Sequence, residues 1–315
     1  MRDDVHDNTA PRAVDLFSGC GGMSLGFINA GFEVVEAYDN WSPAVDVYRR
    51  NFNHPILELD LSNVEKTSAI VLERSPDIII GGPPCQDFST AGLQDETRGR
   101  AALSLAFAKI VEKVRPKWFV MENVPTMRRS PSFPIIQSIF KKAGYGLTCT
   151  VLDAAYCGVP QKRKRLFIIG GIDQQDGFLT DCLLSGQSDS PLSVREYLGD
   201  SLGIDNYFRV PTNYQRRGVF SIDEPSMTIR GVDRPIPKGY KGHPKDSAPI
   251  DEVRPLTPKE RSLIQTFPEE FVFVGSKSNI NQMIGNAVPV KLAEYVAQNL
   301  IRFIIKDGKC SNACS

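Results

Sequence analysis

The sequence predicts an α/β protein with a doubly wound, mostly parallel sheet, joined to a smaller, loop-rich domain. Short apolar runs alternate with helical patterns up to about residue 170. Glycine-rich or acidic segments follow the ends of several of these runs. The next hundred residues are rich in proline, glycine and charge instead. Alternating strands and helices are typical of a parallel sheet covered by helices on both faces.

The strands of this sheet are short and mostly apolar, as buried strands are. They are expected at residues 13–17, 34–38, 77–80, 118–121 and 165–170. Helices are expected at residues 23–30, from Ser42 onward, and at 101–114. Ser42 is a suitable N-cap, because Pro43 then occupies the first helical position. In the third helix, apolar residues recur at the spacing of one helix face.

Composition indicates a globular protein of one large or two ordinary domains. Its 315 residues are 41% hydrophobic and 23% charged, which is typical of soluble proteins. Since no apolar run reaches the roughly 18 residues that span a bilayer, we expect no membrane partner. Seven scattered cysteines without a signal segment indicate reduced thiols in the cytoplasm. Cys310 and Cys314 lack a second ligand pair, so we expect no metal.

The charges are unevenly distributed, although the formal net charge is +0. Residues 171–206 contain seven acids and one base, whereas residues 209–245 contain eight bases and three acids. A neutral protein with such a basic segment can still attract a phosphate backbone. A solvated charged surface is the alternative. Proline and glycine in the basic segment favour a recognition surface built from loops.

A glycine loop and two acids follow the predicted strands. The loop Phe17-Ser18-Gly19-Cys20-Gly21-Gly22 lets a ligand approach backbone N–H groups at a helix start. Asp39 ends the second strand, where it can bind ribose hydroxyls, and Asp60 ends a further apolar segment. No Gly-Lys-Ser/Thr follows the loop, so it is not a P-loop. The set suits S-adenosylmethionine better than NAD, although each acid alone fits a cap or a solvated loop.

A single cysteine follows the strand at 77–80. In Gly81-Gly82-Pro83-Pro84-Cys85-Gln86, the two prolines stiffen the chain just before the thiol. Cys85 at the carboxyl edge of a sheet is placed to act as a nucleophile. A buried structural thiol is the alternative reading of the same residues.

Five ordered motifs resemble those of the (cytosine-5) DNA methyltransferase family. They are Asp15–Gly22, the Gly-Gly-Pro-Pro-Cys-Gln loop at 81–86, Glu122-Asn123-Val124, Gln161–Arg165, and Gln282–Pro289. The resemblance covers residues 15 to about 300. It implies the Rossmann-like fold of S-adenosylmethionine-dependent methyltransferases and a smaller target-recognition domain.

The resemblance also implies the catalytic residues. Cytosine C5 is a weak nucleophile, and a thiolate adding to C6 activates it. Cys85 would be that thiolate, with Pro84 holding it. Glu122 would hold or protonate ring N3, and Asn123 would order the loop around Glu122. Arg163 and Arg165 would bind the O2 side of the base and a nearby phosphate.

The remaining site residues are carried over in the same way. The cofactor S-adenosylmethionine, released as S-adenosylhomocysteine, would contact Phe17, Gly19, Gly21, Asp39, Asp60, Asn286 and Val288. Glutamate is common in the family where this chain has Asp39, and either Asn40 or Trp41 would stack on the adenine. Double-stranded DNA would contact Gln161, Thr228, Arg230 and Arg234. The target cytosine must be flipped out of the helix, and a loop at 86–100 could close over it.

The expected organisation has a catalytic and cofactor-binding domain at 1–170, completed by 280–305. The target-recognition domain would occupy 171–279, and 306–315 would be a C-terminal tail. We expect a monomer in the cytoplasm, associated with the nucleoid through DNA, in a restriction-modification system. Two alternatives remain: a tRNA (cytosine-5)-methyltransferase, and a DNA-binding protein that has lost catalysis.

Overall fold

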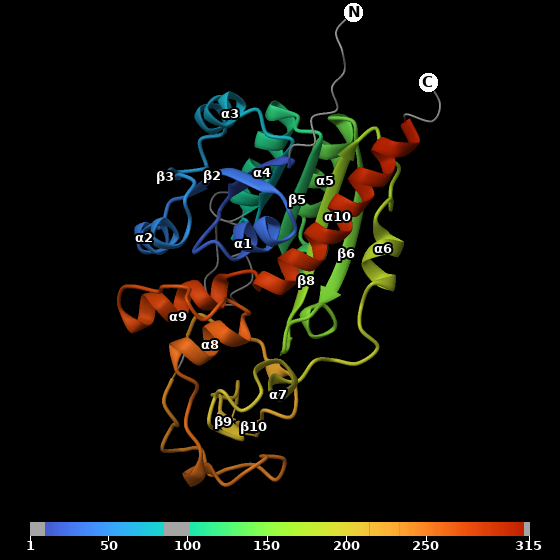
Figure 1. Cartoon of the computed structure of the whole chain (residues 1–315). Helices are drawn as coiled ribbons and strands as arrows, with labels where there is room; N and C mark the ends of the chain where they lie inside the picture. The colour runs from blue at the N-terminus through green and yellow to red at the C-terminus, as the bar shows by residue number, and fades with distance from the viewer. Residues whose placement is uncertain (1–9, 85–100, 214, 233, 312–315) are drawn as a thin grey trace, which may run out of the picture.

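The computed structural model describes residues 10–84, 101–213, 215–232 and 234–311. Seven strands form the main sheet in the order β3-β2-β1-β4-β5-β8-β6 (Figure 1). Their bounds are β1 Arg12–Leu16, β2 Glu33–Asp39, β3 Ile56–Glu58, β4 Ile78–Gly81, β5 Trp118–Asn123, β6 Tyr145–Asp153 and β8 Lys164–Ile172. β1 pairs in parallel with β2 and β4, and β4 pairs in parallel with β5. The predicted mostly parallel sheet is therefore confirmed.

The exception to parallel pairing is β8, which runs antiparallel between β5 and β6. We predicted β8 as a strand from its apolar run, but not its direction. β6 was missed altogether, because its sequence Tyr-Gly-Leu-Thr-Cys-Thr-Val-Leu-Asp contains few strongly apolar residues. Its pairing along the whole of β8 defines it as a strand. Strand direction depends on this pairing and is not visible in the residues alone.

Helices cover both faces of the sheet. They are α1 Gly22–Asn29, α2 Ser42–Asn51, α3 Val64–Glu73, α4 Ala101–Val114, α5 Ser132–Lys142, α6 Thr180–Ser185 and α10 Val290–Ser311. Successive residues of β4 enter different cores, because side chains alternate along a strand. Ile78 packs in a core with Phe27 of α1 and Val296 of α10. Ile79 packs in a second core with Phe107 of α4 and residues of α3 and α5.

Helix α2 begins one residue away from the prediction. Its N-cap is Trp41, and Ser42 is already helical. The Ser42 hydroxyl donates to Glu58 of β3 instead of capping the helix. Pro43 still lies in the first turn, where its missing N–H is not needed.

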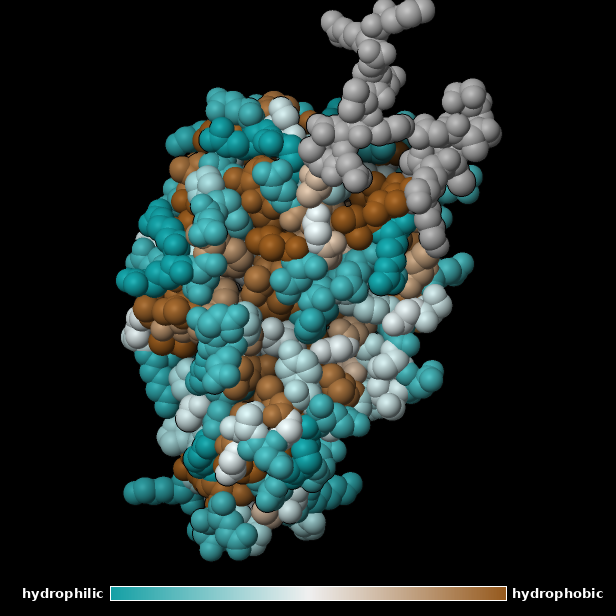
Figure 2. Space-filling model, viewed as in Figure 1, coloured by the Kyte–Doolittle hydropathy of each residue, from teal (hydrophilic) through white to brown (hydrophobic). Residues whose placement is uncertain are grey.

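The smaller lobe lies below the sheet in Figure 1 and contains short elements joined by long loops. They are α7 Val194–Leu198, β9 Asn206–Phe208, β10 Val219–Ser221, β11 Ser226–Met227, η3 Ile250–Glu252, α8 Pro258–Ile264 and α9 Lys277–Asn286. Two 3-10 helices, η1 Pro125–Arg129 and η2 Ala154–Tyr156, and the two-residue strand β7 Gln161–Lys162 complete the main lobe. β11 pairs in parallel with β7, which ties the lobes together. In Figure 2, hydrophilic and hydrophobic residues are interspersed over both lobes.

Packing moves the expected boundary between the lobes. Leu179 and Leu183, at α6, are fully buried in the core that contains Trp118 and Val296. The smaller lobe therefore begins after α6, and the boundary expected at residue 171 is too early. At the other end, α9 contributes to both lobes, because Ile284 packs in the core of the smaller lobe whereas Met283 packs with Cys20 and Val47 of the main lobe. Apolar residues alone do not reveal which of two cores they join.

Within the described part of the chain, none of the helices combines the length and apolar character needed to cross a membrane. The longest, α10, packs along α1, and its fully buried face includes Leu292 and Val296.

Candidate active site

A cavity of about 750 Å³ opens beside the carboxyl ends of the parallel strands. It is lined by the glycine loop after β1, the residues after β2, the Gly82-Pro83-Pro84 segment after β4, and the end of β5. The last turn of α9, the two residues that follow it, and two arginines at the start of β8 also line it. Ligand sites typically measure about 300–1,000 Å³, so a nucleoside cofactor and a base can both enter this cavity.

The glycine loop turns sharply from β1 into α1. Phe17 has φ 60°, Gly19 has φ 54° and Gly21 has φ 96°, a backbone region that glycine enters readily. Gly22 is needed for another reason, since a Cβ there would lie 2.3 Å from the Val288 carbonyl oxygen. The loop and the segment before α10 are therefore in direct contact. Of the predicted cofactor residues, Phe17, Gly19, Asn286 and Val288 line the cavity.

Asp39 links the glycine loop to the start of α2. Its Oδ2 accepts a hydrogen bond from the Gly19 N–H at 2.8 Å, and its Oδ1 accepts from the Trp41 N–H at 2.9 Å. Burial raises the pKa of Asp39, although these bonds oppose the shift. A carboxylate has about four acceptor positions, so the oxygens can still accept from ligand hydroxyl groups. Asp39 lines the cavity, as do Asn40 and Trp41.

Two other predicted cofactor residues lie away from the cavity wall. Asp60 is exposed and accepts hydrogen bonds from the N–H and the hydroxyl of Ser62, each at 2.9 Å. It caps its own turn and is absent from the cavity lining, and its contact with the cofactor stays a prediction. Gly21 packs against Phe52, which a Cβ would approach to 2.3 Å. Its role is to let the loop turn.

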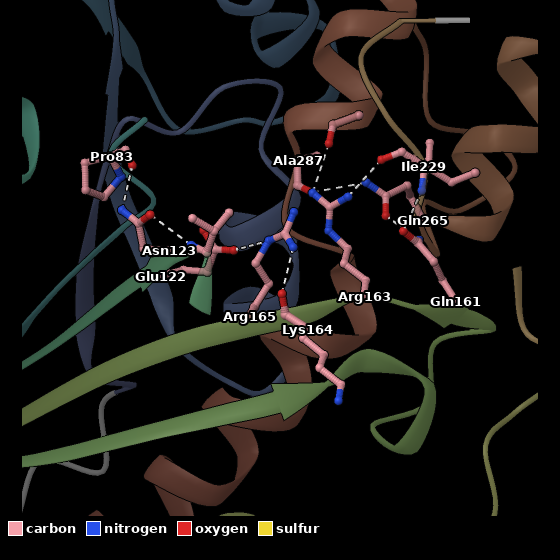
Figure 3. Close-up of polar contacts among 12 residues, drawn as sticks. Pro83, Glu122, Asn123, Gln161, Arg163, Lys164, Arg165, Ile229, Gln265 and Ala287 are labelled. Carbon is pink, nitrogen blue, oxygen red and sulfur yellow. Dashed lines mark hydrogen bonds and ion pairs between the residues drawn. The ribbon is translucent and has the colours of Figure 1, made fainter. Parts of the chain in front are cut away.

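Glu122 and Arg165 form an ion pair at the floor of the cavity. Glu122 ends β5, Arg165 lies on the adjacent β8, and Arg165 Nε donates to Glu122 Oε1 at 2.8 Å (Figure 3). Both side chains are largely buried: 15% of the Arg165 side chain and 11% of the Glu122 side chain are exposed. Burial raises the pKa of Glu122, against the lowering effect of Arg165 and Arg163. Desolvation therefore favours a carboxyl group that can hold a proton.

Asn123 ties the end of β5 to the proline segment. Its Nδ2 donates to the Pro83 carbonyl oxygen at 3.1 Å, and its Oδ1 accepts from the Val124 N–H at 2.8 Å. Gly82 passes so close to the pair that a Cβ there would lie 3.2 Å from Glu122 Oε2. Pro84 is exposed on the cavity wall. Cys85 and the loop at 86–100 lie outside the described residues.

Arg163 is almost completely buried, although the sequence analysis expected it to bind the target base and a phosphate. Only 2% of its surface is exposed, and its guanidinium donates to three carbonyl oxygens (Figure 3). Nη1 donates to Ile229 at 2.9 Å, and Nη2 donates to Gly285 at 2.9 Å and Ala287 at 3.0 Å. Burial and Arg165 lower its pKa well below the ordinary value. Arg163 thus joins the smaller lobe to the segment before α10 at one edge of the cavity.

Replacing Arg163 by methionine is therefore expected to destabilise the fold. The buried carbonyl groups of Ile229 and Gly285 would lose this donor, and Ala287 would keep only the bond from Gln265, which we expect to lower the free energy of unfolding by on the order of 3 kcal/mol. Denaturant unfolding measures this loss. As a control, Arg49→Met removes an arginine whose side chain is 53% exposed, and should change stability by less than about 0.5 kcal/mol. Equal stability of the two variants would contradict the assignment.

Gln161 is fully buried, which corrects its predicted contact with DNA. Its Nε2 donates to Gln265 Oε1 at 2.7 Å, and its Oε1 accepts from the Ile229 N–H at 2.9 Å. Gln265 in turn donates to the carbonyl oxygens of Ile284 at 2.5 Å and Ala287 at 3.1 Å. The sequence analysis missed Gln265, because an isolated glutamine just after a helix, here the C-cap of α8, carries no recognisable signal.

The other predicted DNA contacts are accessible but do not line the cavity. Thr228 donates its hydroxyl to the Lys162 carbonyl oxygen at 2.7 Å and follows β11. Arg230 is exposed two residues later, and its backbone carbonyl accepts from Arg261. Arg234 is also exposed. The role of these three side chains in DNA binding remains a prediction.

Some cavity residues were not singled out by the sequence analysis. They are Ser18, Cys20, Met23, Leu103, Val124, Gln282, Met283, Gly285 and Ala287. Most of them belong to the five motifs, so the sequence indicated that they lie near the site. It did not indicate which of their side chains line the cavity. Leu103 lies on α4 and had been interpreted only as part of a buried helix face. Its place at the cavity depends on how α4 crosses the sheet.

Comparison with known proteins agrees with this geometry. The sequence model of the C-5 cytosine-specific DNA methylase family matches residues 12–179 and 188–302. The type II methyltransferase M.HindV of Haemophilus influenzae is 54% identical over 294 residues, covering 93% of this chain and 97% of the relative. The type II methyltransferase M.HgiDI of Herpetosiphon aurantiacus is 53% identical over 293 residues, covering 93% and 95%.

Solved structures support the fold independently. The S. pombe Dnmt2 methyltransferase superposes with a TM-score of 0.69 at 16% identity, covering 93% of this chain and 99% of that structure. At this identity the likeness concerns the fold alone. The family match spans both lobes, and the resemblance first noted in five motifs holds over the whole of that span. The chain is a member of the C-5 cytosine-specific DNA methylase family.

Proposed function

We propose that this protein transfers the methyl group of S-adenosylmethionine to C5 of a cytosine flipped out of duplex DNA. The observation that carries the proposal is the shared cavity. It brings Asp39 and the glycine loop to one side, and Glu122, Arg165 and the proline segment to the other. A donor molecule and an acceptor base can therefore meet between them. The match to a DNA methylase family and to type II methyltransferases favours this function over RNA methylation and over DNA binding without catalysis.

The residues present suit the proposed cofactor. Asp39 offers a partly buried carboxylate for ribose hydroxyls, and Trp41 offers an aromatic face beside it. A Cβ at Gly19 would meet nothing within 4 Å, so a ligand can lie directly against this part of the loop. When bound, the cofactor would supply an electrophilic methyl group on sulfonium. S-adenosylhomocysteine would be the product left in the same place.

The chemistry then follows from the acceptor side. We assign Cys85 to add as thiolate to C6 of the base, which makes C5 nucleophilic toward the methyl group. Glu122 would share or donate a proton at N3, offsetting the charge that develops on the ring. Loss of the C5 proton to a base and expulsion of Cys85 restore the aromatic ring. Arg165, paired with Glu122, would hold that carboxyl group toward the base.

Asn123 and Arg163 would act as positioning residues. Asn123 bonds the Pro83 carbonyl oxygen, and the chain continues from Pro83 through Pro84 to Cys85. Arg163 holds the smaller lobe against the cavity wall. These roles differ from direct contact with the base, which the sequence analysis expected of Arg163.

The relatives give the biological setting. M.HindV and M.HgiDI are type II methyltransferases, so we propose that this protein modifies a short DNA sequence within a restriction-modification system. It would work as a monomer in the cytoplasm, bound to the DNA of the nucleoid.

The decisive experiment offers DNA and RNA separately. The purified protein is incubated with S-adenosylmethionine and either unmethylated genomic DNA or unmodified tRNA, and 5-methylcytosine is located by single-base sequencing. We expect methylation at one short DNA motif. Methylation of tRNA alone would overturn the DNA assignment in favour of the RNA enzyme, and no methylation of either would favour a DNA-binding protein without catalysis.

Replacing Asp39 by alanine is expected to weaken cofactor binding. Loss of hydrogen bonds to a charged group corresponds to a rise of about 10- to 100-fold in the cofactor Kd, measured by calorimetry with S-adenosylhomocysteine. Asp39→Glu keeps the carboxylate and should recover part of the affinity. Asp46→Ala, which removes an exposed carboxylate of α2, is the matched control and should leave the Kd unchanged. An unchanged Kd in Asp39→Ala would place the ribose contact elsewhere.

A further inference from the structure

The arginines of the smaller lobe fall into two groups. Several are neutralised by carboxylates: Arg195 pairs with Asp200, Asp205 and Asp223, Arg217 with Glu224, and Arg254 with Glu260. Arg209, Arg216, Arg230 and Arg234 differ, since no carboxylate of the described residues pairs with any of them. Arg209 is the half-buried member of this set, and the other three are exposed. A half-buried cation without a counter-ion is costly unless a ligand supplies the charge, so Arg209 is the strongest candidate for binding an anion.

Arg209 is held at the wall of a small notch. Its Nη2 donates to the Thr228 carbonyl oxygen at 3.2 Å, and its backbone N–H donates to Gly218 at 2.8 Å. The notch has a volume of about 30 Å³, and Arg209, Arg230 and Arg261 all line it. Burial, followed by the positive charges of Arg230 and Arg261, lowers the pKa of Arg209 to about 10. Positive groups thus converge on one partly desolvated place.

The notch and the active-site cavity are separated by a single segment of chain. Ile229 lines the notch, and its carbonyl oxygen accepts from Arg163, which lines the cavity. The segment that follows Ile229 also touches the cavity wall. Gly285 lines the cavity, and a Cβ added to it would lie 2.1 Å from the backbone nitrogen of Gly231. A DNA strand that places one nucleotide in the cavity would therefore pass the notch with a neighbouring nucleotide.

The shape of the notch decides which part of DNA it can receive. Base edges lie at the floor of a groove about 8.5 Å deep and are read by side chains that protrude. A recess in the protein can only take a group that projects from the DNA, and the phosphates project. A volume of about 30 Å³ has room for one or two water-sized groups, which suits phosphate oxygens and excludes a base.

We propose that Arg209, in the notch it shares with Arg230 and Arg261, binds one backbone phosphate of the target DNA close to the flipped cytosine. This inference rests on the proposed function, because it presupposes duplex DNA as the substrate. Arg209 then positions the DNA without reading its sequence. Exposed Arg230, at the rim of the notch, remains the candidate for contacting a guanine edge.

The test compares salt dependence of binding. Dissociation constants are measured at several salt concentrations for an unmethylated duplex that contains the target motif and for a duplex of scrambled sequence. Arg209→Met is expected to weaken both about 10-fold and to lower the slope of log K against log salt by about 0.9. Arg209→Lys keeps the charge and should keep the slope. Arg195→Ala, which removes an arginine already neutralised by acids, should keep the slope as well.

Phosphate ethylation gives a second, independent measurement. One phosphate near the target cytosine should weaken binding of the unmodified protein when ethylated, and have no further effect on Arg209→Met. A loss confined to the motif duplex, or an unchanged slope, would overturn the proposal. For Arg230→Ala the expected pattern is the reverse, with discrimination between the two duplexes falling more than general affinity.

The two proposals fail in different ways. If the unmodified protein does not methylate the duplex, the proposed function is wrong and the notch loses its substrate. If it methylates the duplex while Arg209→Met binds with an unchanged slope, the notch proposal alone is wrong. Arg209→Lys covers the case in which the methionine variant does not fold, since a phosphate site should tolerate lysine better than any neutral residue.

Discussion

Replacing Cys85 by serine is expected to abolish methyl transfer while leaving cofactor binding largely intact. A serine hydroxyl is a far weaker nucleophile than a thiolate near neutral pH, so C6 of the base would not be attacked. Turnover is measured with labelled S-adenosylmethionine and a duplex containing the target motif. The cofactor Kd of the same preparation shows that the site is still formed. Methylation at the normal rate by this variant would exclude the proposed mechanism.

Cys149→Ser is the matched control for this experiment. Cys149 lies on β6, is half-buried, and does not line the cavity. Burial raises the pKa of its thiol, so it is a poor nucleophile where it stands. We expect this variant to keep most of the activity. If Cys149→Ser lost activity and Cys85→Ser did not, the nucleophile would be misassigned.

A trapped adduct would identify the attacking atom directly. The reaction must release a proton from C5 before Cys85 can leave, and fluorine at C5 cannot leave as a cation. A duplex with 5-fluorocytosine at the target should therefore remain covalently attached to the unmodified protein after methyl transfer. The denatured complex would migrate as one species in a gel. No such species should form with Cys85→Ser.

Replacing Glu122 by glutamine is expected to lower kcat by about 100- to 10,000-fold, the usual contribution of a general acid or base. Glutamine keeps the size of the side chain but cannot donate an acidic proton to N3. It also removes the ion pair with Arg165 at 2.8 Å. Single-turnover measurements separate this loss from DNA binding. A variant with full kcat would show that Glu122 only supports the structure.

The pH dependence of the rate tests the same assignment through Arg165. Burial raises the pKa of Glu122, and Arg165 is the largest of the opposing causes. Removing that cation in Arg165→Met should raise the pKa further, so Glu122 would stay protonated to higher pH. If the protonated carboxyl group is the active form, the fall in kcat at high pH should move upward. A shift to lower pH would contradict this role.

The sequence by itself predicted β1, β2, β4, β5 and β8 of the main sheet, and the residue types needed at its carboxyl edge. A strand ending in Pro-Pro-Cys and a strand ending in Glu-Asn are local signals, because they depend on residues that are neighbours in the chain. The glycine loop and Asp39 could be predicted for the same reason. Their meeting at one cavity follows from parallel strands sharing an edge.

Only the tertiary structure decided what depends on contacts between distant residues. Arg163 and Gln161 sit in one motif with Arg165, yet their side chains are buried against Ile229, Gly285 and Gln265, far along the chain. Asp60 matched the spacing of a ligand acid but bonds Ser62. Arg195, which pairs with three acids, and Arg209, which pairs with no carboxylate among the described residues, look alike in the sequence. What distinguishes these residues is the partner that each one bonds, and that partner lies up to 124 residues away in the chain. Only folding brings such distant residues into contact.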